Sequence, residues 1–155
     1  MGIGYDVHIL ADGESLVLGG VKIPHDKGIQ GHSDGDVLIH AVVDALLGAA
    51  GLGDMGKFFP SYDDTWKDIS SLLFLEKSAE KLLSAGMEIV NVDSTIIIQE
   101  PRITPHKDEM IKKMAGALSV DPDRISIKAT TTDGLGITGR GEGVAALAVV
   151  SLKAS

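Results

Sequence analysis

The chain has 155 residues, of which 44% are apolar, a formal net charge of −8 and no cysteine. This length and apolar content suit a single catalytic domain over residues 1–155, and the lack of cysteine excludes disulfides, thiolate metal sites and cysteine nucleophiles. The negative charge and scattered basic residues argue against nucleic acid as a partner, because such a surface must neutralise many phosphates.

No segment resembles a secretory signal or a stretch long enough to span a bilayer. We therefore expect no membrane partner and a cytoplasmic location, or a plastid one if a transit peptide has been removed.

The N-terminal part of the chain is typical of strands. Residues 3–9 predict one extended segment and residues 15–23 a second. Gly19 and Gly20 indicate a bend or bulge that makes the second segment a short strand pair.

The next segment is almost continuously apolar over residues 37–50, which predicts a largely buried helix. Ser33 is the expected N-cap of this helix, and Gly51 is placed to end it. Residues 53–68 have no regular apolar period, so we expect a long loop close to the active site.

The second half of the chain predicts a helix, a strand, a helix and two strands, over residues 70–85, 89–99, 104–118, 125–130 and 144–152. This order lacks a glycine fingerprint after the first strand, so it favours an α/β (α+β) fold with a mixed sheet that helices cover on one face. The other face of the sheet needs a cover, and oligomerisation is the simplest one.

Three residues form a candidate metal site. Asp6 and His8 lie two apart on a predicted strand, so their side chains share a face and are about 7 Å apart along it. His40 is a histidine inside an otherwise apolar helix. Two histidines and one carboxylate leave one tetrahedral position open, which is the catalytic arrangement for zinc, and ferrous iron uses the same ligand set. A polar strand face and a hydrogen-bonded core histidine are the simpler interpretations of these residues taken singly.

Two carboxylates flank His40 at helical spacing. Asp36 and Asp44 lie one turn before and one turn after it, on the same helix face. Ligating imidazoles commonly donate their second N–H to a carboxylate, so we expect Asp36 or Asp44 to orient the His40 ring.

Three polar clusters suit a phosphorylated ligand. His32 and Ser33 precede the apolar helix, where free N–H groups favour an anion, although an ordinary N-cap gives the same pattern. Asp54 and Gly56 offer a carboxylate and a bare backbone to a ligand with hydroxyls. The hydroxyl-rich and glycine-rich stretch 129–143 suits a diphosphate bridged by Mg²⁺, or is a plain threonine-rich turn.

Several of these motifs together resemble a known family. They are YDVH at 5–8, GHSDGDVLIHAVVDALLGAAGLGDMGKFFP at 31–60, and KATTTD and GITGRGEG within 128–143. The chain is similar, essentially end to end, to the 2-C-methyl-D-erythritol 2,4-cyclodiphosphate synthase family of non-mevalonate isoprenoid biosynthesis. The resemblance implies a homotrimer with active sites between subunits. It also implies a cyclising phosphoryl transfer that converts a CDP-methylerythritol 2-phosphate into a cyclic diphosphate and CMP.

The resemblance also assigns roles to individual residues. It implies that Asp6, His8 and His40 hold Zn²⁺ or another divalent transition metal, and that Asp133, where the family often has Glu, holds Mg²⁺ or Mn²⁺. It implies catalytic roles for His32 and Thr131. The substrate contacts that it implies are Asp6, His8, His32, Ser33, Asp54, Met55, Gly56, Phe59, Ser61, Asp63, Ile98, Glu100, Arg102, Thr104, Thr130, Thr131, Thr132, Asp133, Ile137 and Arg140.

Two other classes of function stay open on the residues alone. A zinc hydrolase or a ferrous-iron oxygenase would use the same three ligands, but would need a general base near the open metal position, and no residue stands out for that role. A trimeric metal-binding scaffold would need neither the phosphate clusters nor the long loop. Arg140 is a candidate to meet an anion at the trimer axis, unless it is an ordinary surface arginine.

Overall fold

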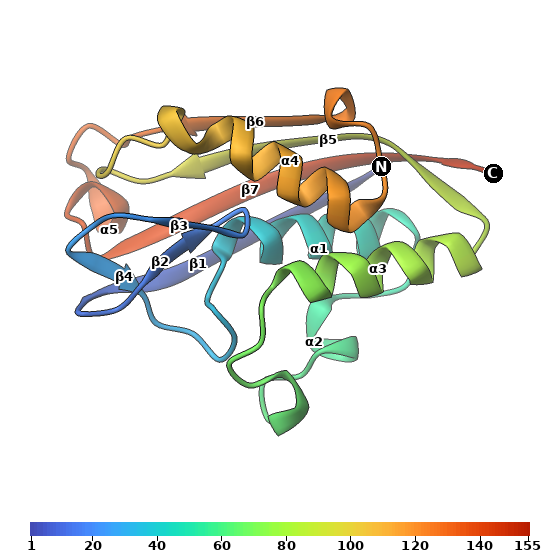
Figure 1. Cartoon of the computed structure of the whole chain (residues 1–155), viewed down its shortest axis with the longest axis horizontal. Coiled ribbons are helices and arrows are strands. Elements are labelled where there is room, and N and C mark those ends of the chain that lie inside the picture. Colours follow the sequence, from blue (N-terminus) through green and yellow to red (C-terminus); the bar gives the residue numbers. More distant parts are fainter.

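A computed structural model describes all residues from 1 to 155 (Figure 1). Its main sheet has the strand order β4-β1-β7-β5-β6, and β5–β6 is its one pair of neighbouring strands that runs parallel. The strands of this sheet are β1 (Gly2–Asp12), β4 (Lys27–Ile29), β5 (Met87–Ile97), β6 (Ile125–Thr130) and β7 (Gly143–Ala154). The prediction of a mixed sheet is therefore confirmed.

A separate antiparallel hairpin follows β1. It consists of β2 (Leu16–Leu18) and β3 (Val21–Ile23), and Gly19 and Gly20 form its turn with positive φ angles of 59° and 75°. The predicted strand pair with a glycine bend is thus confirmed, although it lies outside the main sheet.

The three long helices lie on one side of the main sheet (Figure 1). They are α1 (Val37–Ala49), α3 (Leu72–Ser84) and α4 (Lys107–Leu118). Helix α1 packs directly on β1 and β7, and α3 packs between α1 and α4. The prediction of helices on a single face is confirmed. None of the helices combines the length and the apolar character needed to cross a lipid bilayer.

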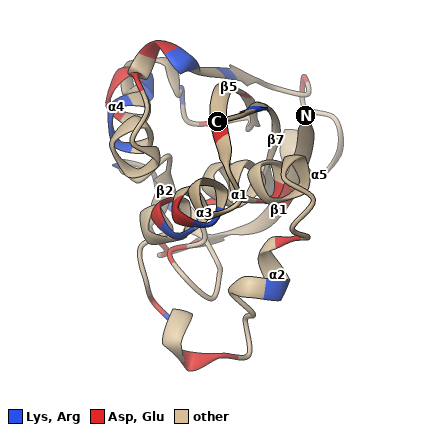
Figure 2. Cartoon of the chain, turned by 90° about the vertical axis from the view of Figure 1, so that its right-hand side faces the viewer, with Lys and Arg blue, Asp and Glu red and all other residues tan.

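Helix α1 is the centre of the hydrophobic core. Ten of its thirteen residues are buried, and Asp44 is its one charged residue. Helices α3 and α4 instead carry acidic and basic residues on their outer faces (Figure 2). Because burial of α1 holds its side chains in fixed positions, it is a rigid support for a functional residue.

The opposite face of the main sheet has no cover within the chain. Alternate residues of β1 and β7 expose apolar side chains there, namely Ile3, Tyr5, Val7, Ile9, Leu147 and Val149. Single exposed apolar residues are ordinary, but a contiguous set is typical of an interaction surface.

The sequence-based boundaries need three corrections. The N-cap of α1 is Asp36 and not Ser33, since an Asp36 side-chain oxygen accepts a hydrogen bond from Ile39 N at 3.1 Å. The loop over 53–68 contains the short helix α2 (Met55–Phe58) and a 3-10 turn (Asp64–Trp66). Strand β4 and the short helix α5 (Gly136–Gly139) were not predicted, and 3-10 turns at Thr104–His106 and Pro122–Arg124 complete the chain.

Candidate metal centre

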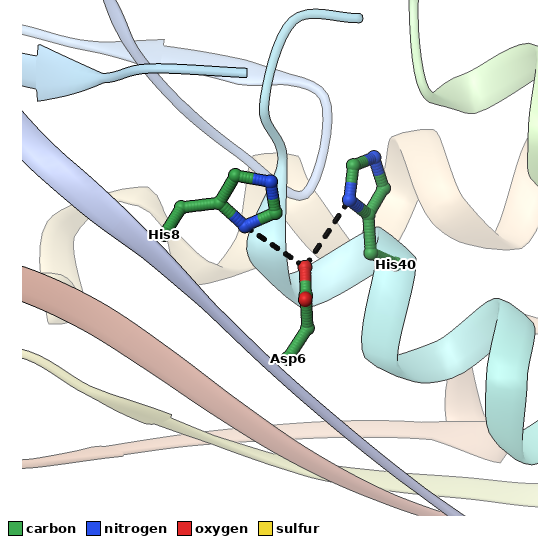
Figure 3. Close-up of side chains that lie close together, drawn as sticks. All are labelled: Asp6, His8 and His40. Carbon is green, nitrogen blue, oxygen red and sulfur yellow. Dashed lines mark hydrogen bonds and ion pairs between the residues drawn. The ribbon is translucent and has the colours of Figure 1, made fainter. Parts of the chain in front are cut away.

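The three predicted metal ligands come together beside the junction of β1 and α1. Asp6 and His8 project from β1 towards α1, and His40 projects from α1 to meet them (Figure 3). Asp6 Oδ2 lies 2.9 Å from His8 Nδ1 and 3.2 Å from His40 Nδ1. One ligand atom from each residue lies within 4.8 Å of the other two. This is the arrangement that a single bound ion requires.

The electrostatics of the cluster favour an ionised carboxylate. Burial opposes ionisation of Asp6, but contacts with the rings of His40 and His8 outweigh it and lower the pKa of Asp6 to about 2. A carboxylate and imidazole nitrogens are ligands that divalent transition metals accept in proteins.

One atom of the cluster has no hydrogen-bond partner. His8 Nδ1 is buried and makes no hydrogen bond, although Asp6 Oδ2 lies 2.9 Å away. Buried polar atoms are seldom left without a partner, and a metal ion would supply one here. The donor set and this orphaned nitrogen both fit a divalent cation.

The prediction that Asp36 or Asp44 orients His40 is wrong. Asp36 is fully buried and accepts hydrogen bonds from Gly19 N, Gly20 N and Ile39 N at 3.0, 2.7 and 3.1 Å. Asp44 accepts from Met55 N at 2.7 Å, so it holds the start of α2. Their carboxylates are thus committed to backbone donors.

Burial also changes the ionisation of these two carboxyl groups. It raises the pKa of Asp36 to about 6, and the charge of Asp34 acts in the same direction against the backbone N–H donors. Burial likewise raises the pKa of Asp44, whereas the hydrogen bond from Met55 N lowers it.

Hydroxyl groups hold His40 instead. His40 Nε2 lies 3.2 Å from the hydroxyl oxygen of Ser33 and 3.2 Å from that of Ser71. Both serines are buried. Ser71 precedes α3 and was not predicted, because it lies 31 residues from His40 and no local pattern marks it.

The residues expected to bind phosphate lie next to the metal cluster. Ser33 contacts the His40 ring, and the neighbouring His32 is partly buried with Nε2 3.3 Å from the carbonyl oxygen of Asp63. The structure therefore brings the segment before α1 against the 53–68 loop, which supports the expected position of this loop near the site.

Within the 53–68 loop, two carboxylates cap short turns. Asp54 accepts from Lys57 N at 3.0 Å at the start of α2, which contains Met55 and Gly56. Asp63 accepts from Thr65 N at 2.9 Å. Hydrogen bonding by the Thr65 side chain and by this backbone N–H lowers the pKa of Asp63. Ser61 is exposed, as are Asp54 and Gly56.

Phe59 has a different environment from the rest of this loop. Its side chain is only 6% exposed and packs against the rings of Trp66 and Phe74. The ring therefore belongs to the core, and only the backbone of Phe59 remains for the substrate contact that the resemblance implies.

The remaining predicted substrate contacts gather at the ends of β5 and β6. Thr131 and Asp133 hydrogen-bond each other, with Asp133 N donating to the Thr131 hydroxyl at 3.2 Å. Arg140 forms a two-pronged ion pair with Glu142 at 2.8 and 3.3 Å. The other members of this group are Ile98, which is buried, and Glu100, Arg102, Thr104, Thr130, Thr132 and Ile137.

This second group does not meet the metal cluster within one chain. His8 of β1 pairs with Val144 of the neighbouring strand β7. Thr130 lies at the end of β6, where it pairs with Ile97 of β5. Three strand spacings separate β1 from β6, which amounts to about 14 Å. One chain thus presents two partial sites that lie three strands apart in its sheet.

The fold and the cluster define an α+β domain with an Asp–His–His site able to hold a divalent metal. The chain belongs to the YgbB family, whose model matches residues 1–153. It is 54% identical to the 2-C-methyl-D-erythritol 2,4-cyclodiphosphate synthase of Desulfatibacillum aliphaticivorans, over 99% of both chains. The family resemblance read from the motifs is confirmed.

Solved structures agree with this assignment. The chain matches the bifunctional IspDF of Campylobacter jejuni with a TM-score of 0.95 and 42% identity, over 99% of this chain and 42% of that one. It matches a CDP complex of Plasmodium falciparum IspF with a TM-score of 0.87 and 33% identity, over 99% of this chain and 95% of that one.

Proposed function

We propose that this protein is a 2-C-methyl-D-erythritol 2,4-cyclodiphosphate synthase. It converts 4-CDP-2-C-methyl-D-erythritol 2-phosphate into the cyclic diphosphate and CMP. The observation that carries the proposal is the convergence of Asp6, His8 and His40 in a chain of full-length similarity to enzymes of this name.

The reaction needs no side-chain nucleophile. An oxygen of the substrate's 2-phosphate attacks the β-phosphorus of the diphosphate, a new P–O bond closes the ring, and the bond to CMP breaks. The protein's task is to fold the substrate so that its own phosphate is aligned, and to neutralise charge. A divalent metal held by Asp6, His8 and His40 supplies electrostatic stabilisation of phosphate oxygens when bound.

Zn²⁺ is the proposed ion for this site, since an Asp–His–His set with an open position is a catalytic zinc arrangement. His32 and Ser33 border the cluster and are placed to bind the phosphate. Asp54 and Gly56 are exposed on the neighbouring loop and suit the hydroxyls of the methylerythritol unit.

The group at the ends of β5 and β6 is proposed to bind the cytidine diphosphate portion. Threonine hydroxyls and backbone amides at 130–132 suit phosphate oxygens, and Asp133 is the proposed ligand of Mg²⁺ or Mn²⁺. The relative from Plasmodium falciparum binds CDP, as its name states.

A homotrimer with active sites between subunits unites these features. The apolar face of β1 and β7 has no cover within the chain. The two partial sites lie three strands apart in the sheet, so a neighbouring copy can complete each one. Assembly through the open sheet face accounts for both observations.

The test is incubation of the purified protein with 4-CDP-2-C-methyl-D-erythritol 2-phosphate, Mg²⁺ and Zn²⁺, followed by ³¹P NMR. We expect CMP and a cyclic diphosphate in equal amounts, and neither after chelation of the metals. Absence of CMP contradicts the proposal. CMP together with an open-chain bisphosphate indicates a hydrolase, and metal binding without turnover of this substrate favours the scaffold.

A further inference from the structure

Behind the metal cluster lies a series of hydrogen-bonded polar groups with no assigned role, of which His40 and Ser71 are buried and Asp34 is partly buried. It runs from His40 through Ser71 to Asp34 and lies on the side of the imidazole that faces away from Asp6. His40 Nε2 lies 3.2 Å from the Ser71 hydroxyl oxygen, and Ser71 is fully buried. These hydrogen bonds link α1 to the start of α3.

Asp34 sets the direction of the hydrogen bonds in this series. Both atoms of Ser71 that can donate do so to the same carboxylate: the hydroxyl donates to Asp34 Oδ1, and the backbone N–H donates to Asp34 Oδ2 at 3.0 Å. Asp36 N also donates to Asp34 Oδ1, at 3.1 Å, which anchors the carboxylate to the N-terminus of α1. A carboxylate only accepts when it is ionised, so the single hydroxyl proton of Ser71 is committed to Asp34.

The hydrogen bond from Ser71 to Asp34 influences which ring nitrogen of His40 carries hydrogen. With its proton given to Asp34, the Ser71 oxygen can accept from His40 but cannot donate to it, so it favours a neutral ring with hydrogen on Nε2. His40 Nδ1 then presents a lone pair to the metal cluster, where the Asp6 carboxylate, 3.2 Å away, pulls in the opposite direction and favours hydrogen on Nδ1 as long as no cation lies between them. Which nitrogen of a ligating histidine binds the metal is set by the hydrogen bond of the other nitrogen.

We infer that Ser71 and Asp34 are positioning residues that favour the His40 tautomer able to bind metal through Nδ1. This inference rests on the metal centre of the proposed function. In many metal sites the ligating imidazole contacts a carboxylate directly. Here the Ser71 hydroxyl lies between the His40 ring and the Asp34 carboxylate.

Ser33 does not impose the same choice. Its hydroxyl oxygen also lies 3.2 Å from His40 Nε2 and 3.3 Å from the Ser71 hydroxyl. No carboxylate claims its proton, so Ser33 can donate to His40 as well as accept from it. Without Ser71 and Asp34, donation by Ser33 would favour the opposite tautomer, with hydrogen on Nδ1 and no lone pair for a metal.

The first test reads the tautomer directly in the metal-free protein. Nitrogen-15 NMR of histidine-labelled protein, at a pH where the ring is neutral, distinguishes protonated from unprotonated ring nitrogens, and His40→Ala assigns the signals. Because the Asp6 carboxylate competes for hydrogen on Nδ1, we expect both forms, with a larger fraction of Nε2–H in the wild type than in Ser71→Ala. An equal fraction in the two proteins, or a larger one in Ser71→Ala, overturns the inference.

The second test measures metal affinity by competition with a chromophoric chelator for Zn²⁺. We expect Ser71→Ala to weaken Zn²⁺ binding roughly 10–100-fold, the usual effect of losing such a partner. Ser71→Thr keeps the hydroxyl and should restore most of the affinity, and the visible spectrum of Co²⁺-loaded protein should change in Ser71→Ala but not in Ser71→Thr. Affinity and spectrum unchanged in Ser71→Ala contradict the inference.

Both tests stand apart from synthase activity. If the protein released no CMP but showed the expected tautomer and metal affinities, the proposed function would fail and the roles of Ser71 and Asp34 would stand. If Ser71→Ala failed to fold, Asp34→Ala, which removes the acceptor of the Ser71 hydroxyl proton, would replace it in both experiments, with the same expected direction.

Discussion

Gly4 of β1 lies against the backbone of Ala41 in α1, so closely that a Cβ atom on Gly4 would overlap the Ala41 carbonyl oxygen. This close approach brings His40, the residue before Ala41, within reach of Asp6, two residues beyond Gly4. The metal cluster therefore depends on the absence of a side chain at Gly4.

We predict that Gly4→Ala destabilises the fold by about 3 kcal/mol or more, since the clash is with backbone atoms that cannot rotate away. Urea unfolding measures this loss. Gly48→Ala, in the helix α1 that Gly4 contacts, is the control, because a Cβ atom at Gly48 meets nothing within 4 Å. We expect that control to be neutral or stabilising by up to ~1 kcal/mol. Equal effects of the two substitutions would contradict the close-packing argument.

The second prediction concerns His40→Ala. This variant should lose bound metal and synthase activity while keeping the fold and the assembly, because buried Val and Leu residues hold α1 in place. Metal analysis and circular dichroism on the same sample separate the two effects. His106→Ala, which changes a histidine outside the cluster, should retain its metal. An unfolded His40→Ala chain would show that the site is structural.

The third prediction is a pH dependence of stability that comes from Asp36. The pKa of Asp36 is about 6 in the folded protein, against 3.8 for an ordinary aspartate side chain, so the folded state binds the proton more tightly. The stability that Asp36 contributes is therefore present at low pH and is lost as the pH rises through 6.

Asp36→Asn isolates this effect, because the amide does not titrate. The difference in unfolding free energy, wild type minus variant, should grow by about 1 kcal/mol between pH 7 and pH 5. Urea titrations of both proteins at the two pH values give the number. A difference that shrinks on acidification would mean that the three backbone N–H donors outweigh burial.

The fourth prediction tests the open face of the sheet. Val149 is 45% exposed among the apolar side chains of β1 and β7. A charge there would have to be desolvated in an interface, so Val149→Glu should convert the proposed trimer to monomer in sedimentation equilibrium. Leu83→Glu is the control, since Leu83 is an exposed apolar residue of α3, away from this face. A trimeric Val149→Glu protein would place the interface elsewhere.

Local patterns in the sequence predicted the long elements and the three metal ligands. Asp6 and His8 share a strand face, and His40 interrupts an apolar helix, so both signals lie within a few residues. Strand β4 and helix α5 have three and four residues, which is too short for a periodic pattern.

Long-range contacts decided what the sequence left open. Ser33 and Asp36 are both good N-cap residues, and the contacts of Asp36 with Gly19 and Gly20 select it. The partner of His40 is likewise a residue brought in by α3, so helical spacing pointed to the wrong carboxylates.

The alternation along β1 has a consequence for how this strand can change. Gly4, Asp6 and His8 face the helices, while Tyr5 and Val7 lie on the open side. Insertion or deletion of a single residue before Asp6 would reverse this parity: the ligands would turn to the open side, and bulky side chains would be driven against α1. A substitution in β1 changes one face of the strand at a time, whereas a shift of one residue removes the metal cluster and the apolar surface together.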